Sequence, residues 1–330
     1  MKIAFLSCAH VHTLSYVESL KRSSIVDDIS LFDYSTEEGK KFSKINNINF
    51  HDNIGDALRG ADGAIICAAN AEHIRYIREC SGYNIPILCE KPLATTKGDG
   101  DSILRIIKDT GSSLHMSLPV RFTRQAVMLK EMVKSSAFGD IVSLSGTNHG
   151  TLPGGWFRSL ALSGGGAIMD HGPHVIDLIR WATGHEISNV YAVTSNRFNG
   201  LEIEDSALLS MEMDNGVIAF LDPSYSRGDY FPTWGDVTLN VEGTDLSAYY
   251  DFLGNKFDRY SIKSKKTHEY VGYDTDMDFN MILDFLALIK NGSNAKHSML
   301  ATLDDGYSEL MVILAAYRSA REKKKVKIER

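Results

Sequence analysis

The chain has 330 residues, of which 43% are apolar and 23% are charged, and its net charge at neutral pH is −7. This length suits two domains better than one, and the composition is that of an ordinary soluble globular protein. The acidic balance argues against nucleic acid as a partner, because nucleic-acid-binding proteins usually carry a basic face. The basic run 321–327 closes a helical pattern and is interpreted as a solvated helix end.

No apolar stretch reaches the roughly 20 residues that a bilayer span requires, so we expect no membrane contact. Residues 1–6 lack the pattern of a signal peptide and are interpreted as the first strand. The four cysteines, at positions 8, 67, 80 and 89, form no Cys-x-x-Cys pair. Reduced thiols are therefore expected, and with them a cytoplasmic location.

Short apolar runs alternate with helical patterns up to residue 119. The patterns predict strands over residues 2–7, 29–33, 63–68, 85–89 and 113–118, helices over 12–21, 36–44, 71–80 and 97–110, and a helical turn over 56–59. This alternation is typical of an α/β fold with a doubly wound parallel sheet. We therefore expect a dinucleotide-binding Rossmann domain over residues 1–119.

Beyond residue 119 the pattern changes to consecutive strands separated by turns such as Asp214-Asn215-Gly216. Strands are predicted over residues 141–149, 190–197, 206–213, 217–224, 236–242, 246–251 and 257–261, and helices over 124–134, 165–183, 277–290 and 303–322. The prediction is an α+β domain over residues 120–330 with a large, mainly antiparallel sheet. Because such a sheet commonly pairs its open face with another subunit, we expect a homodimer or homotetramer formed through it.

The turn after the first strand lies where a dinucleotide fold carries its glycine fingerprint. Here Ser7, Ala9 and His12 fill the three glycine positions. Asp33 ends the second strand, where a carboxylate would accept hydrogen bonds from the ribose hydroxyls; the alternative is a strand-end turn residue. Because no arginine directly follows Asp33, NAD is favoured over NADP.

Lys91 follows the strand predicted at 85–89, within Cys89-Glu90-Lys91-Pro92-Leu93. Ligands bind at the carboxyl edge of such sheets, where a lysine can bond to a substrate hydroxyl. The alternative is an exposed loop lysine paired with Glu90.

A second motif begins at Gly164-Gly165-Gly166 and contains Asp170 and His174. Residues four apart on a helix share a face, and a carboxylate beside an imidazole suits a general base for alcohol oxidation. The alternative is a capping aspartate and a core histidine. Pro173 is expected to kink the helix or to begin a new one.

Glu90-Lys91-Pro92 and the spacing Asp-x-x-x-His-x-x-Asp, which ends at Asp177, resemble the paired motifs of the Gfo/Idh/MocA oxidoreductases, the family of glucose-fructose oxidoreductase and inositol dehydrogenase. The resemblance implies hydride transfer between a nicotinamide cofactor and a sugar, an inositol or a related polyol. It implies Lys91, Asp170 and His174 as the catalytic group, and a structural role for Asp177.

The same resemblance suggests which residues surround the cofactor. Ala68, Asn70 and His73 resemble the family's loop on the nicotinamide side, although Asn70 could equally cap a helix. Arg121 resembles a family residue near the cofactor pocket or the domain junction. The predicted cofactor-binding residues are Ser7, Ala9, His10, His12, Asp33, Ala68, Asn70, His73, Glu90, Lys91 and Arg121.

Substrate contacts are predicted for His149, Trp156 and His171, with Trp156 as a wall for a sugar ring or simply a packing residue. We expect His10, His12, His149, His171 and His174 to face one cleft. That cleft would be a polar polyol pocket or, alternatively, a divalent metal site with His and Asp ligands. The spacing of His10 and His12 matches no common metal motif, so no metal is predicted; these two histidines could instead hold phosphate oxygens.

Two other functions remain open. Some members of the family retain bound NAD and catalyse an elimination, hydrolysis or epimerisation without net redox change. Others bind a dinucleotide or a sugar as non-catalytic regulators. The loss of the glycines favours a regulator, whereas Lys91, Asp170 and His174 favour an enzyme.

Overall fold

The protein is represented by a computed structural model that describes residues 1–228, 231, 235–254, 256–259, 269–272, 276–292 and 298–329. The chain divides into two compact units. The first unit holds Met1–Pro119, Ala161–Gly164 and Asp278–Leu310, and the second unit holds Val120–Leu160, Gly165–Met277 and Met311–Arg330.

The predicted second domain, 120–330, therefore loses residues 161–164 and 278–310 to the first unit. The physical reason is packing against the sheet of the first unit. Gly63 leaves room for Ile289 and Phe285, because a Cβ at Gly63 would lie 2.5 Å from Ile289. Ala301–Thr302 then pairs with the last parallel strand of that sheet. A sequence pattern shows that a helix has an apolar face but not which sheet that face covers.

The first unit contains the predicted doubly wound parallel sheet, ordered β15-β6-β5-β4-β1-β2-β3, and only β15 is antiparallel to its neighbour. Both faces of a parallel sheet are covered, and accordingly every residue of β4 and β5 is buried. The strands are β1 (Lys2–Leu6), β2 (Asp28–Phe32), β3 (Asn49–Phe50), β4 (Gly63–Ile66), β5 (Ile87–Glu90), β6 (Leu114–Ser117) and β15 (Ala301–Thr302). The helices are α1 (Thr13–Arg22), α2 (Thr36–Asn46), α3 (Ile54–Leu58), α4 (His73–Cys80), α5 (Lys97–Thr110) and α9 (Met277–Asn291), with 3-10 turns η1 (Asn70–Glu72) and η2 (Ser81–Tyr83).

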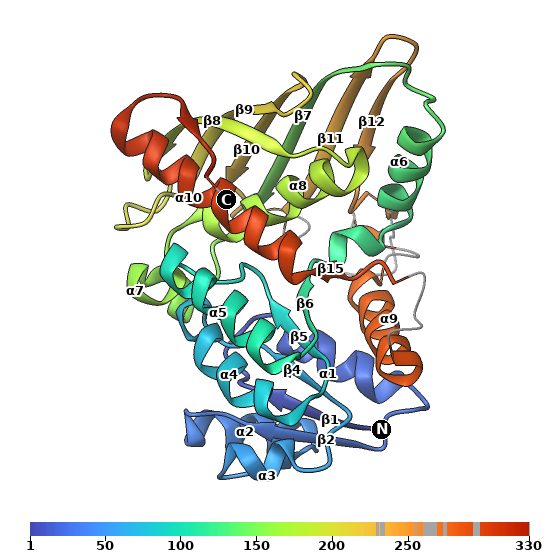
Figure 1. Cartoon of the computed structure of the whole chain (residues 1–330), viewed down its shortest axis with the longest axis vertical. Helices are drawn as coiled ribbons and strands as arrows, with labels where there is room; N and C mark the ends of the chain where they lie inside the picture. Colours follow the sequence, from blue (N-terminus) through green and yellow to red (C-terminus); the bar gives the residue numbers. More distant parts are fainter. Residues whose placement is uncertain are drawn as a thin grey trace. The chain divides into compact units, whose positions relative to one another are not determined.

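The second unit is built on the predicted large sheet, ordered β12-β11-β7-β10-β9-β8-β16 (Figure 1). Its pairs are antiparallel except for β7 with β10, which is parallel. The strands are β7 (Ile141–Gly150), β8 (Ile187–Ser195), β9 (Ser206–Met213), β10 (Ile218–Ser224), β11 (Gly235–Gly243), β12 (Ser247–Asp251) and β16 (Val326–Lys327). The helices are α6 (Arg124–Lys134), α8 (Ala167–Thr183) and the larger part of α10 (Leu303–Glu322), with 3-10 turns η3 (Pro119–Phe122) and η4 (Gly155–Arg158). Helix α7 (Leu160–Ser163) and the beginning of α10 belong to the first unit.

A separate pair of strands, β13 (Lys256–Arg259) and β14 (Glu269–Gly272), completes the described elements. The strand predicted at 257–261 coincides with β13 up to residue 259, and its last two residues lie outside the described part of the chain.

Helix α8 covers one face of the large sheet and is buried on nearly all sides (Figure 1). The helix approaches β7 closely at Gly146, where a Cβ would lie 2.5 Å from Val175 and 3.2 Å from the carbonyl oxygen of Thr238. The opposite face, called the outer face below, exposes the large apolar side chains of Tyr191, Val193, Leu208, Ile218, Phe220 and Tyr249.

None of the helices in the described ranges combines the length and the apolar character that crossing a membrane would require.

Replacing Gly146 by alanine should destabilise the protein by about 1–3 kcal/mol, because the added methyl group pushes α8 away from the sheet. Gly172→Ala is the matched control, since a Cβ there meets its nearest neighbours at 3.7 Å and lies within α8. That control should be neutral or stabilising by up to about 1 kcal/mol. Thermal unfolding of both variants checks the prediction, and an equal melting temperature for the two would contradict it.

Candidate functional site

The turn after β1 keeps the backbone shape of the glycine fingerprint although its glycines are missing. Ser7 adopts a φ of 67°, the left-handed conformation that normally favours glycine. Its hydroxyl donates to Asp33 Oδ2 at 2.9 Å, and the N–H of Cys8 donates to the same oxygen at 2.7 Å. Asp33 therefore stabilises a conformation that costs a non-glycine residue about 1–2 kcal/mol.

Asp33 is buried, and its other oxygen accepts from the N–H of Ser35 at 2.8 Å. A carboxylate can accept about four hydrogen bonds, and Asp33 already accepts three. The predicted ribose contact would therefore use the remaining acceptor position. It therefore stays a prediction. The left-handed backbone of Ser7 and the strand order of the sheet nevertheless fit a dinucleotide, because both place the turn at the carboxyl edge beside Asp33.

Next along the turn, His10 and His12 converge on the carboxylate of Glu90, at the end of β5. Glu90 Oε1 lies 3.1 Å from His12 Nδ1 and 3.6 Å from His10 Nδ1. Glu90 is fully buried, which alone would raise its pKa, but the two imidazoles outweigh burial and hold that pKa well below its usual range. Burial would likewise lower the pKa of His12, and the Glu90 carboxylate reverses this and raises it. Glu90 is therefore held as a buried carboxylate, and the imidazoles of His10 and His12 stabilise its negative charge.

The loops after β4 and β5 are joined by His73. Its Nδ1 lies 2.9 Å from the carbonyl oxygen of Pro92 and its Nε2 lies 3.3 Å from that of Ala68. Asn70 is buried and donates to the carbonyl oxygen of Ser163 at 2.8 Å; it begins η1 rather than capping it. Lys91 is 3% exposed, and its N–H donates to Glu90 Oε2 at 3.2 Å.

Within the first unit, the structure therefore gathers most of the predicted cofactor residues along one edge of the parallel sheet. The N–H of His10 donates to the carbonyl oxygen of Cys67 at 2.9 Å, which ties the first turn to the end of β4. The alternative of an exposed loop lysine is wrong for Lys91, which is buried.

In the second unit, Glu204 fixes the start of α8. Its carboxylate accepts from the N–H groups of Gly166 at 3.0 Å and Ile168 at 2.9 Å, and from Tyr317 Oη at 2.7 Å. Glycine is required at position 166 by the close approach of the Glu204 backbone, because a Cβ at Gly166 would lie 1.7 Å from the carbonyl oxygen of Glu204. A carboxylate at a helix N-terminus also interacts favourably with the helix dipole.

Helix α8 runs through Pro173 without ending, so the expected start of a new helix at this proline is not found. Asp170 and His174 lie on it and are 8% and 6% exposed. Asp170 Oδ2 accepts a hydrogen bond from the buried Tyr225 Oη at 3.0 Å and lies 3.6 Å from His171 Nε2. One residue that was predicted from the sequence, His171, and one that was not, Tyr225, thus meet at this carboxylate.

His171 itself is held by the sheet. Its Nδ1 lies 3.1 Å from the carbonyl oxygens of both Asn148 and Ser224, so this nitrogen carries a proton and donates it. The ring also packs edge-on against Tyr225, with centroids 4.9 Å apart. His171 is therefore anchored between α8 and the ends of β7 and β10; its substrate contact stays a prediction.

Arg121 is used inside the second unit. Its guanidinium forms a two-pronged ion pair with Asp177, with Nε 2.6 Å from Oδ2 and the second nitrogen in contact with Oδ1. Both side chains are at most 3% exposed, and the guanidinium lies 5.4 Å from the ring centre of Trp181. This contact agrees with the expected structural role of Asp177, whereas the cofactor contact of Arg121 stays a prediction.

Removing one partner of this buried pair should be costly. Asp177→Ala should lower the free energy of unfolding by about 3–5 kcal/mol, because it leaves a buried guanidinium without its counter-charge. Glu322→Ala, which breaks the exposed pair with Arg318 in α10, is the control and should cost less than about 1 kcal/mol. Denaturant unfolding measures both, and similar losses would argue against the importance of burial.

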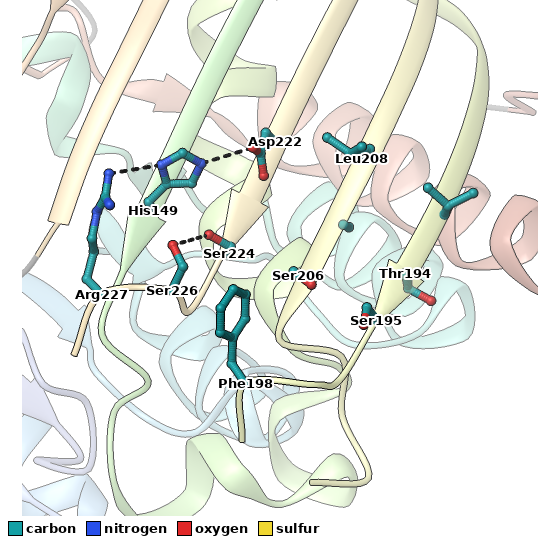
Figure 2. Close-up of a pocket in the computed structure, with 12 residues that line it drawn as sticks. His149, Thr194, Ser195, Phe198, Ser206, Leu208, Asp222, Ser224, Ser226 and Arg227 are labelled. Carbon is teal, nitrogen blue, oxygen red and sulfur yellow. Dashed lines mark hydrogen bonds and ion pairs between the residues drawn. The ribbon is translucent and has the colours of Figure 1, made fainter. Parts of the chain in front are cut away.

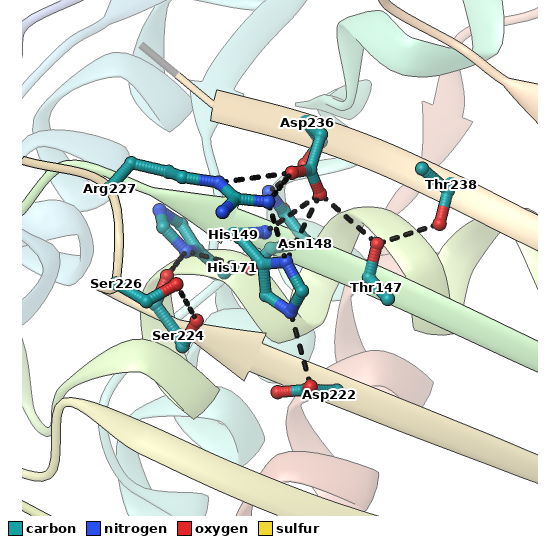
Figure 3. Close-up of polar contacts among 10 residues, drawn as sticks. All are labelled: Thr147, Asn148, His149, His171, Asp222, Ser224, Ser226, Arg227, Asp236 and Thr238. Atoms are coloured by element: carbon teal, nitrogen blue, oxygen red, sulfur yellow. Dashed lines mark hydrogen bonds and ion pairs between the residues drawn. The ribbon is translucent and has the colours of Figure 1, made fainter. Parts of the chain in front are cut away.

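His149 lies on the outer face of the sheet, away from α8, so the structure does not bring it together with His174. Side chains alternate along a strand: Asn148 is fully buried, whereas His149 projects to the other side. There it contacts Asp222 at 3.2 Å, Asp236 at 3.5 Å and Arg227 at 3.2 Å (Figure 3). The expectation that five histidines share one cleft is therefore corrected by the pleat of β7.

A pocket of about 470 Å³ opens beside His149 on the outer face (Figure 2). Hydroxyl groups dominate its polar lining, His149, Asp222 and Arg227 lie together at one end, and the ring of Phe198 also lines it. Its lining residues are His149, Val193, Thr194, Ser195, Phe198, Ser206, Ala207, Leu208, Asp222, Ser224, Ser226 and Arg227.

Hydrogen bonds to Asp222 and Asp236 raise the pKa of His149 to about 9, although burial opposes this. In the unfolded chain the pKa is near 6.5. A raised pKa in the folded state contributes stability that is complete below pH 6.5 and is lost as the pH rises through about 9. His149→Gln should therefore lower the melting temperature clearly at pH 6 and much less at pH 10.

Thermal unfolding across that range measures the difference, and His185→Gln is the control, because His185 and its partner Asp214 are both about half exposed. A His149 variant whose deficit is constant with pH would contradict the assignment.

The predicted wall residue Trp156 stacks on the buried Phe157 within η4, with ring centres 3.8 Å apart. This contact supports the packing alternative; a sugar contact stays a prediction.

Sequence reasoning missed three residues. Tyr225 and Glu204 lie 55 and 34 residues from Asp170 along the chain, and no spacing rule links them to it. Arg75, from α4, lies 3.1 Å from the ring centre of Tyr34, the residue that follows Asp33. The sequence indicated that no arginine directly follows Asp33, but the fold supplies one from another helix.

Two family models match the chain. Residues 8–118 match the model described as "Oxidoreductase family, NAD-binding Rossmann fold", and residues 126–249 match that of the "GFO/IDH/MocA C-terminal domain".

Among curated relatives, the rhizopine catabolism protein MocA of Rhizobium meliloti is 26% identical over 46% of this chain and 47% of its own length. The myo-inositol 2-dehydrogenase of Thermotoga maritima is 23% identical over 81% of this chain and 80% of its own. The chain spans only about half of the first two curated relatives that it matches, 47% and 57% of their lengths.

Among solved structures, GenD2 from gentamicin A biosynthesis, in complex with NAD, matches with a TM-score of 0.87 at 21% identity, covering 100% of this chain and 97% of that one. The myo-inositol 2-dehydrogenase of Lactobacillus plantarum matches with a TM-score of 0.82 at 20% identity, covering 100% and 99%. At these identities the likeness concerns the fold.

Proposed function

Because the chain belongs to the Gfo/Idh/MocA oxidoreductase family, we propose that it is an NAD-dependent oxidoreductase that acts on an alcohol group of a sugar, an inositol or a related polyol. The observation that carries the proposal is the first turn, where Ser7 holds the conformation of the missing glycine with the help of Asp33. A chain that had lost dinucleotide binding would have no need to keep this strained backbone. The names of the relatives, which include inositol and sugar dehydrogenases, support the substrate class.

The cofactor would lie along the edge formed by Ser7, Ala9, His10, His12 and Asp33, with further contacts from Ala68, Asn70, His73, Glu90, Lys91 and Arg121. Bound nicotinamide would supply the acceptor for the hydrogen and the electron pair that leave the alcohol carbon. NAD is proposed over NADP because Asp33 is a carboxylate, which would repel a 2′-phosphate. Arg75, above Tyr34, is the feature that could favour NADP instead.

The chain's own residues would handle the alcohol proton. We propose that His174 accepts it, that Asp170 orients His174 and stabilises its charged form, and that the Lys91 ammonium holds the oxygen. Tyr225 and His171 would fix the carboxylate of Asp170, which reduces the number of arrangements it can adopt. His149 and Trp156 remain candidates for substrate contacts.

We also propose that a second copy of the chain covers the outer face of the large sheet. The exposed apolar side chains there, including Leu208 at 58% and Tyr249 at 63%, support an interface. A cytoplasmic location is part of the proposal, because all four cysteines are free thiols.

The first test is a titration of the purified protein with NADH and, separately, with NADPH, followed by nicotinamide fluorescence. Saturable binding that is tighter for NADH is expected, and Arg75→Ala should weaken only NADPH binding. A protein that binds neither dinucleotide is not the proposed oxidoreductase.

The second test measures NAD reduction with a panel of inositols and sugars. Lys91→Ala and His174→Ala should each lower kcat by about 10²–10⁴-fold, a much larger change than any change in NADH affinity. His185→Ala, an exposed histidine of the second unit, is the matched control and should retain full activity. Substrate conversion without net NADH formation would indicate non-redox net chemistry, and full activity of Lys91→Ala would refute its assigned role.

A further inference from the structure

Three side chains converge between the turn before α1 and the end of β5: His10, His12 and Glu90. They are proposed above as cofactor contacts, and none of them takes part in the proposed proton transfer. His10 and Glu90 are buried, and the His12 side chain is 28% exposed. One potential ligand atom from each of the three lies within 4.8 Å of the others. Such a convergence of two imidazoles and a carboxylate is the donor set of several divalent metal sites.

The distances are close to those of a coordination sphere. Ligand atoms bound tetrahedrally at about 2.0–2.2 Å from a metal lie about 3.4 Å apart. Glu90 Oε1 lies 3.1 Å from His12 Nδ1 and 3.6 Å from His10 Nδ1. Two of the three separations are thus close to those of a tetrahedral site, and the third lies within 4.8 Å.

The protonation state of His10 is also suitable. Its Nδ1 accepts the N–H of His12 at 3.2 Å, so this nitrogen carries a lone pair and not a proton. A metal bound there would replace the His12 N–H as the partner of that lone pair. A neutral imidazole is the form that binds metal.

We propose that His10, His12 and Glu90 bind a divalent first-row transition cation such as Zn²⁺. Two nitrogen donors favour this class over Mg²⁺ and Ca²⁺, which prefer oxygen. Three protein ligands leave a fourth position for a water or a ligand oxygen, and the partly exposed edge of His12 supplies the route to it. The competing explanation is that a protonated His12 serves only as the counter-charge of Glu90.

Calorimetric titration of the metal-stripped full-length protein with Zn²⁺ tests the proposal, with no dinucleotide present. One equivalent should bind, and Mg²⁺ should not compete. His12→Ala should bind Zn²⁺ at least about 100-fold more weakly, since even outer-shell changes cost 10–100-fold. Glu90→Gln, which keeps the side-chain shape, should give a similar loss.

Two controls separate this site from adventitious binding. His185→Ala removes an exposed histidine, and Cys8→Ser removes the thiol nearest to the cluster in sequence; both should bind as the wild type does. Cobalt(II) should give visible absorption bands of a tetrahedral site in the wild type but not in His12→Ala.

The absence of stoichiometric Zn²⁺ binding by the wild type would overturn the proposal, as would binding that survives in His12→Ala or disappears in Cys8→Ser. The oxidoreductase function is tested separately, by titration with NADH in metal-free buffer, and the absence of NADH binding there would refute it. Binding of NADH without binding of Zn²⁺ would support the oxidoreductase function and refute the metal site. Binding of Zn²⁺ without binding of NADH would support the metal site and refute the oxidoreductase function.

Discussion

The first unit depends on two buried carboxylates at one edge of its parallel sheet. Asp33 holds the turn after β1, where Ser7 has the backbone conformation of a glycine. Glu90 ends β5 and draws His10 and His12 toward it. A buried carboxylate without hydrogen-bond donors would be very costly, so each of the two fixes the groups that surround it. These contacts hold the turn in the absence of the fingerprint glycines.

The second unit orders its polar groups by a different means, the approach of one helix to one sheet. Gly146 and Gly166 let α8 lie close to β7 and to Glu204, where any side chain would collide. This contact places Asp170 beside Tyr225 and His171. The position of the Asp170 carboxylate therefore depends on the packing of α8 at Gly146 and Gly166.

The pleat of the large sheet separates two polar systems that the sequence suggested were one. Asn148 and His149 are neighbours in the chain, but one is buried and the other belongs to the outer face with Asp222 and Asp236. The outer face combines exposed apolar side chains with a compact charged network and a pocket. The polar groups of the outer face are thus separate from those of α8, although β7 contributes a residue to each.

The sequence by itself determined the doubly wound sheet, the antiparallel-rich second sheet and the family, because hydrophobic periodicity and motif spacing are local properties of the chain. The sequence also indicated Lys91, Asp170 and His174 as catalytic candidates. Only the tertiary structure decided that α9 packs on the first unit, that Tyr225 donates to Asp170, and that His149 points away from α8. These outcomes depend on which faces meet across long sequence separations, and a side chain carries no local signal of its distant partner.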